Sequence, residues 1–410
     1  MIRLFCFFSL LLTICNSQAQ TIDSTILRKH IAYLASDKLQ GRAPGTKGEK
    51  SAADYIAKEF KKYKLQAKGS KGYFQSFDYQ QSENPHDTIL TEGTGYTGKN
   101  VIGYLDNGAK KTIVVGAHYD HLGNDGRGSS LEGDAHGKIH NGADDNASGT
   151  AGMLELARIF ATNVTKEKTN FLFIAFSAEE AGLIGSKYFT NNPTIPLESI
   201  HCMINMDMIG RLVDSTQKLL IFGVGTGDIF VDHLKKVNRK RFELVLDSSG
   251  VGPSDQTSFY LKQIPVLHFF TGQHSDYHKS TDDIEKINFK GETKVLNYIA
   301  DIMRDFAIAP QIKYLETRTK ESEKMSFKVT LGVMPDYAFQ GQGLRLDAVN
   351  KDKPAEKAGL LAGDIVIQLG DVVVNNIYDY MNGLAKYKKG DTVTVIVKRG
   401  EESISKAVTF

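Results

Sequence analysis

Apolar runs alternate with stretches of helical spacing through the first three quarters of the chain. Three short runs rich in β-branched and aromatic residues are typical of buried strands, at 112–115, 171–176 and 200–204. Apolar residues at helical spacing predict helices at 151–160, around 228–240 and at 289–306. This alternation predicts an α/β fold, with a mixed sheet covered by helices on both faces.

The amino-terminal part follows a different pattern. Residues 22–63 show helical spacing on both sides of a loop with the sequence G-R-A-P-G-T, Gly41 to Thr46. Glycine and proline alone indicate a turn there, and a loop that approaches a substrate is the alternative. Residues 100–105 are then expected to form the first strand of the main sheet.

Residues of the types that bind metal ions follow the apolar runs. The strings A-H-Y-D, G-A-D-D-N-A-S-G, S-A-E-E-A-G, N-M-D-M-I-G and S-D-Y-H-K-S-T-D contain, in order, His118, Asp144, Glu180, Asp207 and His278, with Glu179 beside Glu180. In an open α/β sheet the carboxyl ends of the strands share one crevice. Zinc accepts imidazole nitrogen and carboxylate oxygen, and two neighbouring ions need a bridging carboxylate. The pattern therefore predicts a two-zinc hydrolase site.

These strings, in this order, resemble the zinc aminopeptidases of the M28 family, and the resemblance runs from about Ile31 to Phe306. It implies that Asp144 bridges two zinc ions, that Glu180 and His278 complete one site, and that His118 and Asp207 complete the other. It also implies that Glu179 is the general base, and that Tyr277 is an oxyanion donor, as in some members of the family. We expect Asp120 to orient the imidazole of His118 through its other nitrogen.

Simpler explanations exist for single motifs. Asp144, Asp145 and Asn146 are also typical caps of the helix expected at 151–160. The two glutamates suit the first turn of a helix, where the macrodipole favours carboxylates. Asp207, in contrast, follows the apolar run 202–206, where an unpaired charge is costly to bury. The joint placement of all five residues favours the metal site.

The remaining histidines are assigned less specific roles. His121, His136 and His140 lie in or beside the Gly-rich stretch 123–142, so we expect an exposed loop and solvated imidazoles there. His274, four residues before His278, is the alternative zinc ligand, but the string Y-H-K-S-T-D fits the family pattern at His278. His268 lies between apolar residues and is expected in the core.

Length and charge limit the remaining possibilities. The chain has 410 residues, which is long for one domain. Its 50 basic and 48 acidic residues give a net charge of +2. Nothing in this balance points to nucleic acid or to an anionic membrane surface.

Residues 1–19 have the pattern of a signal peptide: Arg3, an apolar stretch at 4–14, and Ser17-Gln18-Ala19 as a cleavage signal. We expect an exported protein, periplasmic or secreted, with a lipoprotein anchored at Cys15 as the weaker alternative. The apolar stretch is too short to span a bilayer. The mature chain would keep Cys202 as its single cysteine, which excludes an internal disulfide and predicts a small buried apolar residue.

The last hundred residues predict a separate domain. Residues 313–325 are charged and lack an apolar period, so we expect a linker between a peptidase domain at 20–312 and a β-rich domain at 326–410. Short strands are expected at 327–333, 344–349, 364–369 and 392–397, with helices at 354–358 and 378–384. The string P-A-E-K-A-G-L-L-A-G-D-I-V, Pro354 to Val366, resembles the bacterial PDZ module. That resemblance implies capture of peptide carboxyl termini at Thr330 to Val333, and a spacer without bound peptide is the alternative.

The sequence thus predicts an exported metallo-aminopeptidase with two zinc ions per chain, acting on peptides with a free amino terminus. A glutaminyl-cyclase-like enzyme is the alternative inside the fold, although it would use a single zinc. An inactive peptide-binding protein is the alternative in another class. It would be expected to lack Glu179 or a ligand, and the chain has all of them.

Overall fold

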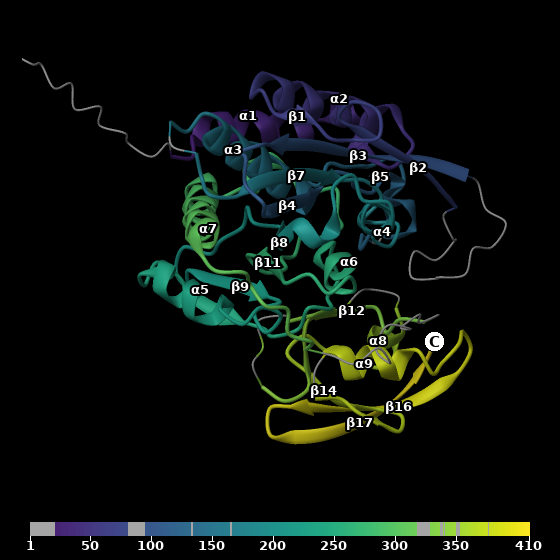
Figure 1. Cartoon of the computed structure of the whole chain (residues 1–410). Coiled ribbons are helices and arrows are strands. Elements are labelled where there is room, and N and C mark those ends of the chain that lie inside the picture. Colours follow the sequence, from purple (N-terminus) through teal and green to yellow (C-terminus); the bar gives the residue numbers. More distant parts are fainter. Residues whose placement is uncertain are drawn as a thin grey trace, which may run out of the picture.

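Two folded units follow one another along the chain, an α/β unit and a smaller β-rich unit (Figure 1). The computed structural model describes residues 21–80, 95–132, 134–164, 166–317, 329–336, 339, 341–349, 353–375 and 377–410. The expected signal peptide at 1–19 lies outside the described residues, as does most of the expected linker.

A nine-stranded mixed sheet forms the centre of the first unit, with the order β1-β3-β7-β4-β8-β11-β9-β10 and β2 paired with β3. The four central strands β7, β4, β8 and β11 run parallel to one another, whereas β3 is antiparallel to β7 and β9 is antiparallel to β11. The bounds are β1 (Gln66–Ala67), β2 (Phe74–Gln80), β3 (Gly95–Leu105), β4 (Thr112–His118), β7 (Asn170–Phe176), β8 (Ile200–Met206), β9 (Lys218–Phe222), β10 (Glu243–Leu246) and β11 (Val266–Phe270). The expected mixed sheet is confirmed, although two strands precede the segment that was expected to come first.

Helices cover both faces of this sheet. One core contains side chains of α1, α2, α3, α5 and α7, and a second core on the other face contains side chains of α4 and α6. Alternate residues of β7 face these two cores, because successive side chains of a strand point to opposite faces. The bounds are α1 (Ser24–Leu34), α2 (Lys47–Lys62), α3 (Gly149–Ala161), α4 (Ile184–Asn191), α5 (Phe230–Asn238), α6 (Gln256–Tyr260) and α7 (Phe289–Ile308).

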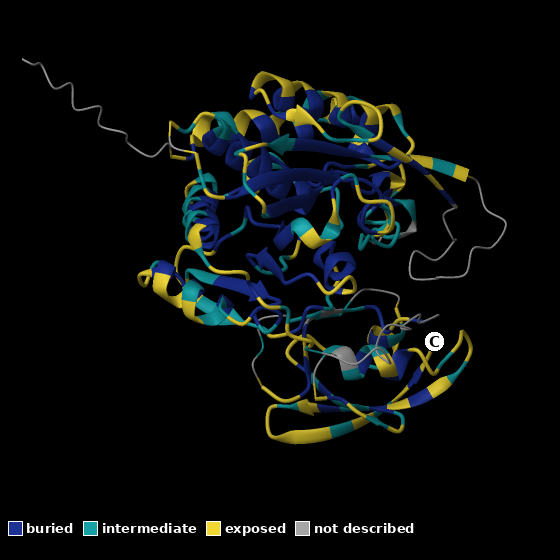
Figure 2. Cartoon of the chain, in the orientation of Figure 1, coloured by how far each residue is buried: buried dark blue, intermediate teal, exposed yellow. Residues whose placement is uncertain are grey.

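The central strands are buried along their whole length. All seven residues of β4, β7 and β8 are buried, which explains why they form continuous apolar runs in the sequence (Figure 2). Cys202 and His268 lie in this buried sheet, as the sequence predicts.

The Gly-rich stretch 123–142 is more ordered than an exposed loop. It contains a two-stranded sheet of β5 (Gly123–Asn124) and β6 (Ile139–His140), with the turn η2 (Asp125–Gly128) between them. His121 and His140 are fully buried, so the expectation of solvated imidazoles is wrong for both. His136 has a side chain that is 95% exposed, and for this residue the expectation holds.

The second unit is a six-stranded antiparallel sheet with two helices and its own core, which includes Leu331, Leu346, Val366 and Val395. Arg399 Nε lies 2.7 Å from Oδ1 of the buried Asp364 and ties β16 to the turn before β14. The bounds are β12 (Val333–Pro335), β13 (Leu344–Val349), α8 (Pro354–Lys357), β14 (Ile365–Leu369), β15 (Val372–Val373), α9 (Ile377–Leu384), β16 (Thr392–Arg399) and β17 (Glu402–Thr409).

The first residues of the expected linker are packed onto the first unit. Ile312 is 2% exposed and belongs to the main core. Leu315 N donates to Thr226 O at 2.8 Å, and Thr317 N donates to the hydroxyl of Tyr260 on α6 at 3.0 Å. The α/β unit therefore extends to at least Thr317, five residues beyond the boundary expected from the sequence.

This docking predicts a difference between two shortened proteins. A chain that ends after Ala309 loses the burial of Ile312, about 1.5–3 kcal/mol, and several hydrogen bonds of about 1 kcal/mol each. A chain that ends after Thr317 keeps them. We expect the shorter protein to melt at least about 5 °C below the longer one in calorimetry. Equal melting temperatures would mean that residues 310–317 do not stabilise the first unit and belong to the linker.

Candidate metal centre

The carboxyl ends of β4, β7 and β8 meet at one edge of the sheet, because these strands are parallel neighbours. His118 is the last residue of β4, Glu179 and Glu180 follow β7, and Asp207 follows β8 directly. Asp145 lies in the π-turn η3 (Ala143–Ser148) before α3, and His278 lies in the loop after β11. The structure thus gathers residues from five separate parts of the chain.

Two groups of ligand-type atoms are formed at this edge. In the first, His118 Nε2 lies 3.3 Å from Asp145 Oδ1 and 3.3 Å from Asp207 Oδ1. The second consists of His121, Asp145 and Glu180, and beside it His278 Nε2 lies 3.3 Å from Asp145 Oδ2 and 3.2 Å from Glu180 Oε2. Asp145 therefore presents one carboxylate oxygen to each group.

Asp144 does not occupy this central position, which corrects the expectation from the sequence. Its Oδ1 accepts a hydrogen bond from Gly210 N at 2.7 Å, and its Oδ2 lies 3.1 Å from His274 Nε2. Successive residues of this turn point in different directions. The two adjacent aspartates therefore identify the motif in the sequence, but they do not show which of the two faces both groups. The same contact holds His274 at Asp144, away from the two groups.

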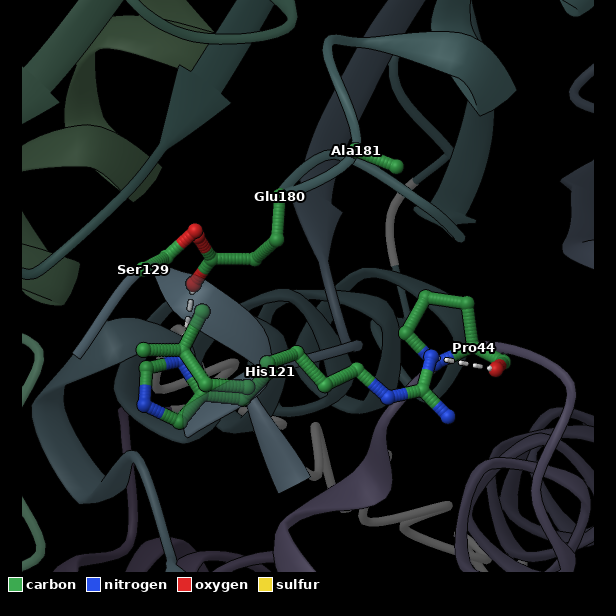
Figure 3. Close-up of a pocket in the computed structure, with 7 residues that line it drawn as sticks. Pro44, His121, Ser129, Glu180 and Ala181 are labelled. Atoms are coloured by element: carbon green, nitrogen blue, oxygen red, sulfur yellow. Dashed lines mark hydrogen bonds and ion pairs between the residues drawn. The ribbon is translucent and has the colours of Figure 1, made fainter. Parts of the chain in front are cut away.

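His121 is a site residue that the sequence analysis missed. Its Nδ1 lies 2.8 Å from Glu180 Oε1 (Figure 3). The same nitrogen lies 3.9 Å from Asp145 Oδ2, so His121 is part of the second group. Pro44, Ser129 and Ala181 line the pocket beside this pair. The available signal was spacing, because His121 follows His118 by three residues at the same strand end.

Asp120 holds the turn that carries the two glutamates. Its carboxylate accepts hydrogen bonds from Glu179 N at 3.1 Å and Glu180 N at 3.3 Å. His118 Nδ1 lies 3.3 Å from the backbone carbonyl of Asp120 and 3.8 Å from its carboxylate. The backbone carbonyl is thus the nearer acceptor, which leaves Nε2 of His118 directed at the two aspartates.

The stretch 123–142 and Tyr277 hold His278 in place. Nδ1 of His278 lies 3.1 Å from Ser129 O, and Leu131 N donates to the carbonyl of His278 at 3.0 Å. The ring of Tyr277 stacks on the imidazole with centroids 3.9 Å apart. Tyr277 also packs against an apolar cluster that includes Met208 and Phe270. Its role as an oxyanion donor stays a prediction.

The electrostatics of the site favour positive charge. Although burial opposes the charged form, Asp207 and Glu179 raise the pKa of His118 well above its usual value. Burial likewise opposes the shift at Glu180, but the charge of His278 lowers the pKa of Glu180 to about 2. Burial raises the pKa of Glu179 well above the usual carboxyl range, and neighbouring carboxylates raise it further.

The residue types at this edge fit divalent cations. Imidazole nitrogens and carboxylate oxygens are the zinc ligands expected for such a site, and protons and metal ions compete for the same lone pairs. Nε2 of His278 is buried and has no hydrogen-bond partner, although two carboxylates lie near it. Glu179 belongs to neither group of ligand-type atoms among the described residues.

Comparison with protein families agrees with both units. Residues 100–303 match the model of peptidase family M28, and residues 319–409 match the PDZ domain model. The leupeptin-inactivating enzyme 1 of Streptomyces exfoliatus is 27% identical over 270 residues, which cover 62% of this chain and 50% of the relative. Aminopeptidase YwaD of Bacillus subtilis is 30% identical over 209 residues, which cover 48% and 42%. The chain thus spans about half or less of the length of these curated relatives.

Solved structures share the fold. BSAP, a zinc aminopeptidase from Bacillus subtilis, superposes with a TM-score of 0.57 at 18% identity, over 74% of this chain and all of the other. A glutaminyl cyclase from Bacteroides thetaiotaomicron superposes with a TM-score of 0.57 at 18% identity, over 70% and 99%. At this level of identity the likeness concerns the fold alone.

The position of Asp145 between the two groups generates a test with a matched control. Asp145→Asn removes the negative charge that both groups share, so we expect zinc affinity at both positions to fall by at least about 10²-fold. Asp144→Asn keeps an acceptor for Gly210 N and should retain two zinc ions per chain. Metal analysis after dialysis against a chelator series measures both. The reverse result would return the central role to Asp144.

Proposed function

Because this chain belongs to peptidase family M28 and carries a PDZ domain, we propose that it is a two-zinc aminopeptidase that removes amino-terminal residues from peptides. The observation that supports this proposal most directly is the carboxylate of Asp145, which faces His118 on one side and His278 on the other. Asp207 would complete the first zinc site and Glu180 the second.

The chemistry needs a general base that is not itself a ligand. Zinc, when bound, supplies a Lewis acid that polarises the scissile carbonyl and acidifies water. Glu179 would take the proton of the attacking water and return it to the leaving amine. The backbone bond from Glu179 N to Asp120 fixes the start of this side chain. The positive charges of the metal ions would lower the pKa of Glu179 into the range that this role needs.

His121 would act behind the second zinc site. Its Nδ1–H donates to Oε1 of Glu180, while Oε2 of Glu180 faces His278. A hydrogen bond of this kind orients a ligand carboxylate. We therefore assign His121 to positioning and His278 to ligation.

Two other functions are tested by the same assay. A glutaminyl cyclase would need one zinc, whereas His118, Asp145 and Asp207 offer a complete second set of ligands. An inactive peptide-binding protein would not need Glu179. Neither alternative accounts for both groups together.

The deciding experiment compares substrates with free and acetylated amino termini. We expect the full-length protein to cleave aminoacyl p-nitroanilides, to leave their acetylated forms intact, and to lose activity with a chelator. Equal cleavage of both forms would exclude an aminopeptidase. Release of ammonia from peptides with an amino-terminal glutamine, without hydrolysis, would indicate a cyclase.

The role of Glu179 gives a second prediction. Glu179→Gln should lower kcat by about 10²- to 10⁴-fold while the protein keeps two zinc ions, because proton transfer is lost and ligation is not. Glu155→Gln is the control, since Glu155 is also buried but pairs with Arg158 on α3. Loss of metal in Glu179→Gln would make Glu179 a ligand.

We further propose that the PDZ domain binds carboxyl termini of peptides or proteins. β12 is at the edge of its sheet, the position at which a peptide can pair as an added strand. Gly332 N, in the loop expected to hold the carboxylate, donates to Thr330 Oγ1 at 3.0 Å. A peptide carboxylate would have to compete with this internal bond. Fluorescence anisotropy should show binding of a free-acid peptide and weaker binding of its amide, whereas equal signals would support the spacer.

Export remains a proposal that rests on the amino-terminal sequence. No helix in the described part of the chain is both long enough and apolar enough to cross a membrane. Sequencing of the protein isolated from cells that make it should begin at Gln20. A sequence that starts at Met1 would contradict cleavage.

A further inference from the structure

The side chain of Arg42 is large and fully buried. Among the described residues, its guanidinium forms no ion pair with a carboxylate. It belongs to the segment Gly41 to Thr46, for which the sequence left open a turn or a contact with the substrate. The guanidinium instead points into the protein. Burying a guanidinium is costly unless its donors are used, so the position calls for a specific reason.

Backbone carbonyls use the whole guanidinium fork. Nε donates to Tyr119 O at 2.8 Å, and Nη1 donates to Leu34 O at 2.5 Å and to Asn141 O at 2.5 Å. Nη2 donates to Gly142 O at 3.0 Å. All four acceptors are main-chain atoms, so the contacts fix the path of the chain.

Two of these contacts lie next to the metal centre. Tyr119 stands between His118 and Asp120, and Gly142 lies three residues before Asp145. In addition, His121 N approaches Arg42 O at 3.4 Å. One side chain therefore connects the loop after β4 with the turn that carries Asp145.

The surrounding packing keeps Arg42 in this position. A Cβ atom on Gly41, at a φ of +68°, would lie 2.4 Å from His140 O and 2.6 Å from the Cα of Gly123. The segment thus fits directly against the two-stranded sheet of β5 and β6. This fit leaves little room for Arg42 to move away from the two loops.

The charge of Arg42 alone does not explain its place. Burial lowers its pKa to about 10, opposed by Asp145, Asp120, Asp282 and Glu180, so the group stays charged at neutral pH. A fixed positive charge repels a divalent cation, and this effect by itself would weaken metal binding. The planar fork, which spans several carbonyls at once, is what a lysine could not supply.

We propose that Arg42 is a positioning residue of the metal centre, whose guanidinium fork sets the spacing between the His118 loop and the Asp145 turn before metal binds. The inference rests on the proposed two-zinc site. Because Asp145 is shared by both groups, a shift of its turn changes the two zinc sites together.

Arg42→Lys tests this proposal because it keeps the charge and removes the fork. We expect zinc affinity at both sites to fall by about 10- to 100-fold, the usual effect of losing a group that orients ligands. The measurement is competition of the full-length protein with a chromophoric chelator. Arg158→Lys is the matched control, since Arg158 also bridges segments, from Glu155 to Thr21 O, but away from the site. It should leave zinc affinity unchanged.

The outcomes separate a positioning role from a structural one. Wild-type zinc affinity in Arg42→Lys, with only a lower melting temperature of the metal-free protein, would overturn the proposal. If the wild-type protein itself fails to bind two zinc ions, the proposed function fails instead.

A second measurement needs no variant. Hydrogen exchange of the backbone amides at 119–121 and 141–145 should be nearly as slow in the metal-free wild-type protein as in the zinc-loaded form, because Arg42 already holds both loops. Rapid exchange without metal would show that zinc, and not Arg42, orders them, and would overturn the proposal even if Arg42→Lys does not fold.

Discussion

A buried carboxylate that faces two imidazoles is the interaction on which the rest of this site depends. Asp145 is 3% exposed, and its two oxygens are directed at His118 and His278. Burial alone would raise the pKa of this carboxylate, but the neighbouring imidazoles of His118 and His278 hold its pKa well below the usual value. The geometry that keeps Asp145 charged also makes the position attractive to divalent cations.

The two turns that carry the carboxylates of these groups are held by further hydrogen bonds. Asp120 accepts the amides of Glu179 and Glu180, and Asp282 Oδ2 accepts the amides of Asp144 and Asp145 at 3.0 Å each. Each turn thus has its amides bound to a buried carboxylate that is not itself in a ligand group. These carboxylates, together with the carbonyls around Arg42, fix the backbone, so that side chains from distant parts of the sequence meet within a few ångströms.

The sequence predicts the strands well because their burial is complete. β4, β7 and β8 have apolar side chains on both faces, so they form recognisable runs, and the residues that follow them mark the edge of the sheet. Asp207 and His118 could be placed by this reasoning alone. The choice between Asp144 and Asp145 could not, because it depends on the direction of each side chain within one turn.

His121 shows the second limit of sequence reasoning. Glycines on its carboxyl side indicate an exposed loop, yet β5 pairs with β6 and the stretch folds back over His278. Long-range contacts of this kind leave no periodic signal. The end of the first unit was placed too early, near residue 312, for a related reason. The charged residues that follow indicate a linker, although the main chain of Tyr314 pairs with that of Gly227.

The segment that contains Tyr314 is also held to the first unit by side-chain contacts. Thr317 Oγ1 lies 3.2 Å from the hydroxyl of Tyr260, and Gly250 N donates to Thr317 Oγ1 at 3.1 Å. Thr317 is therefore anchored at the end of α6, and Asp255 directly precedes this helix. Asp255 is a buried carboxylate close enough to Glu179 to raise its pKa. Residues 312–317 are thus held to the first unit by both main-chain and side-chain contacts.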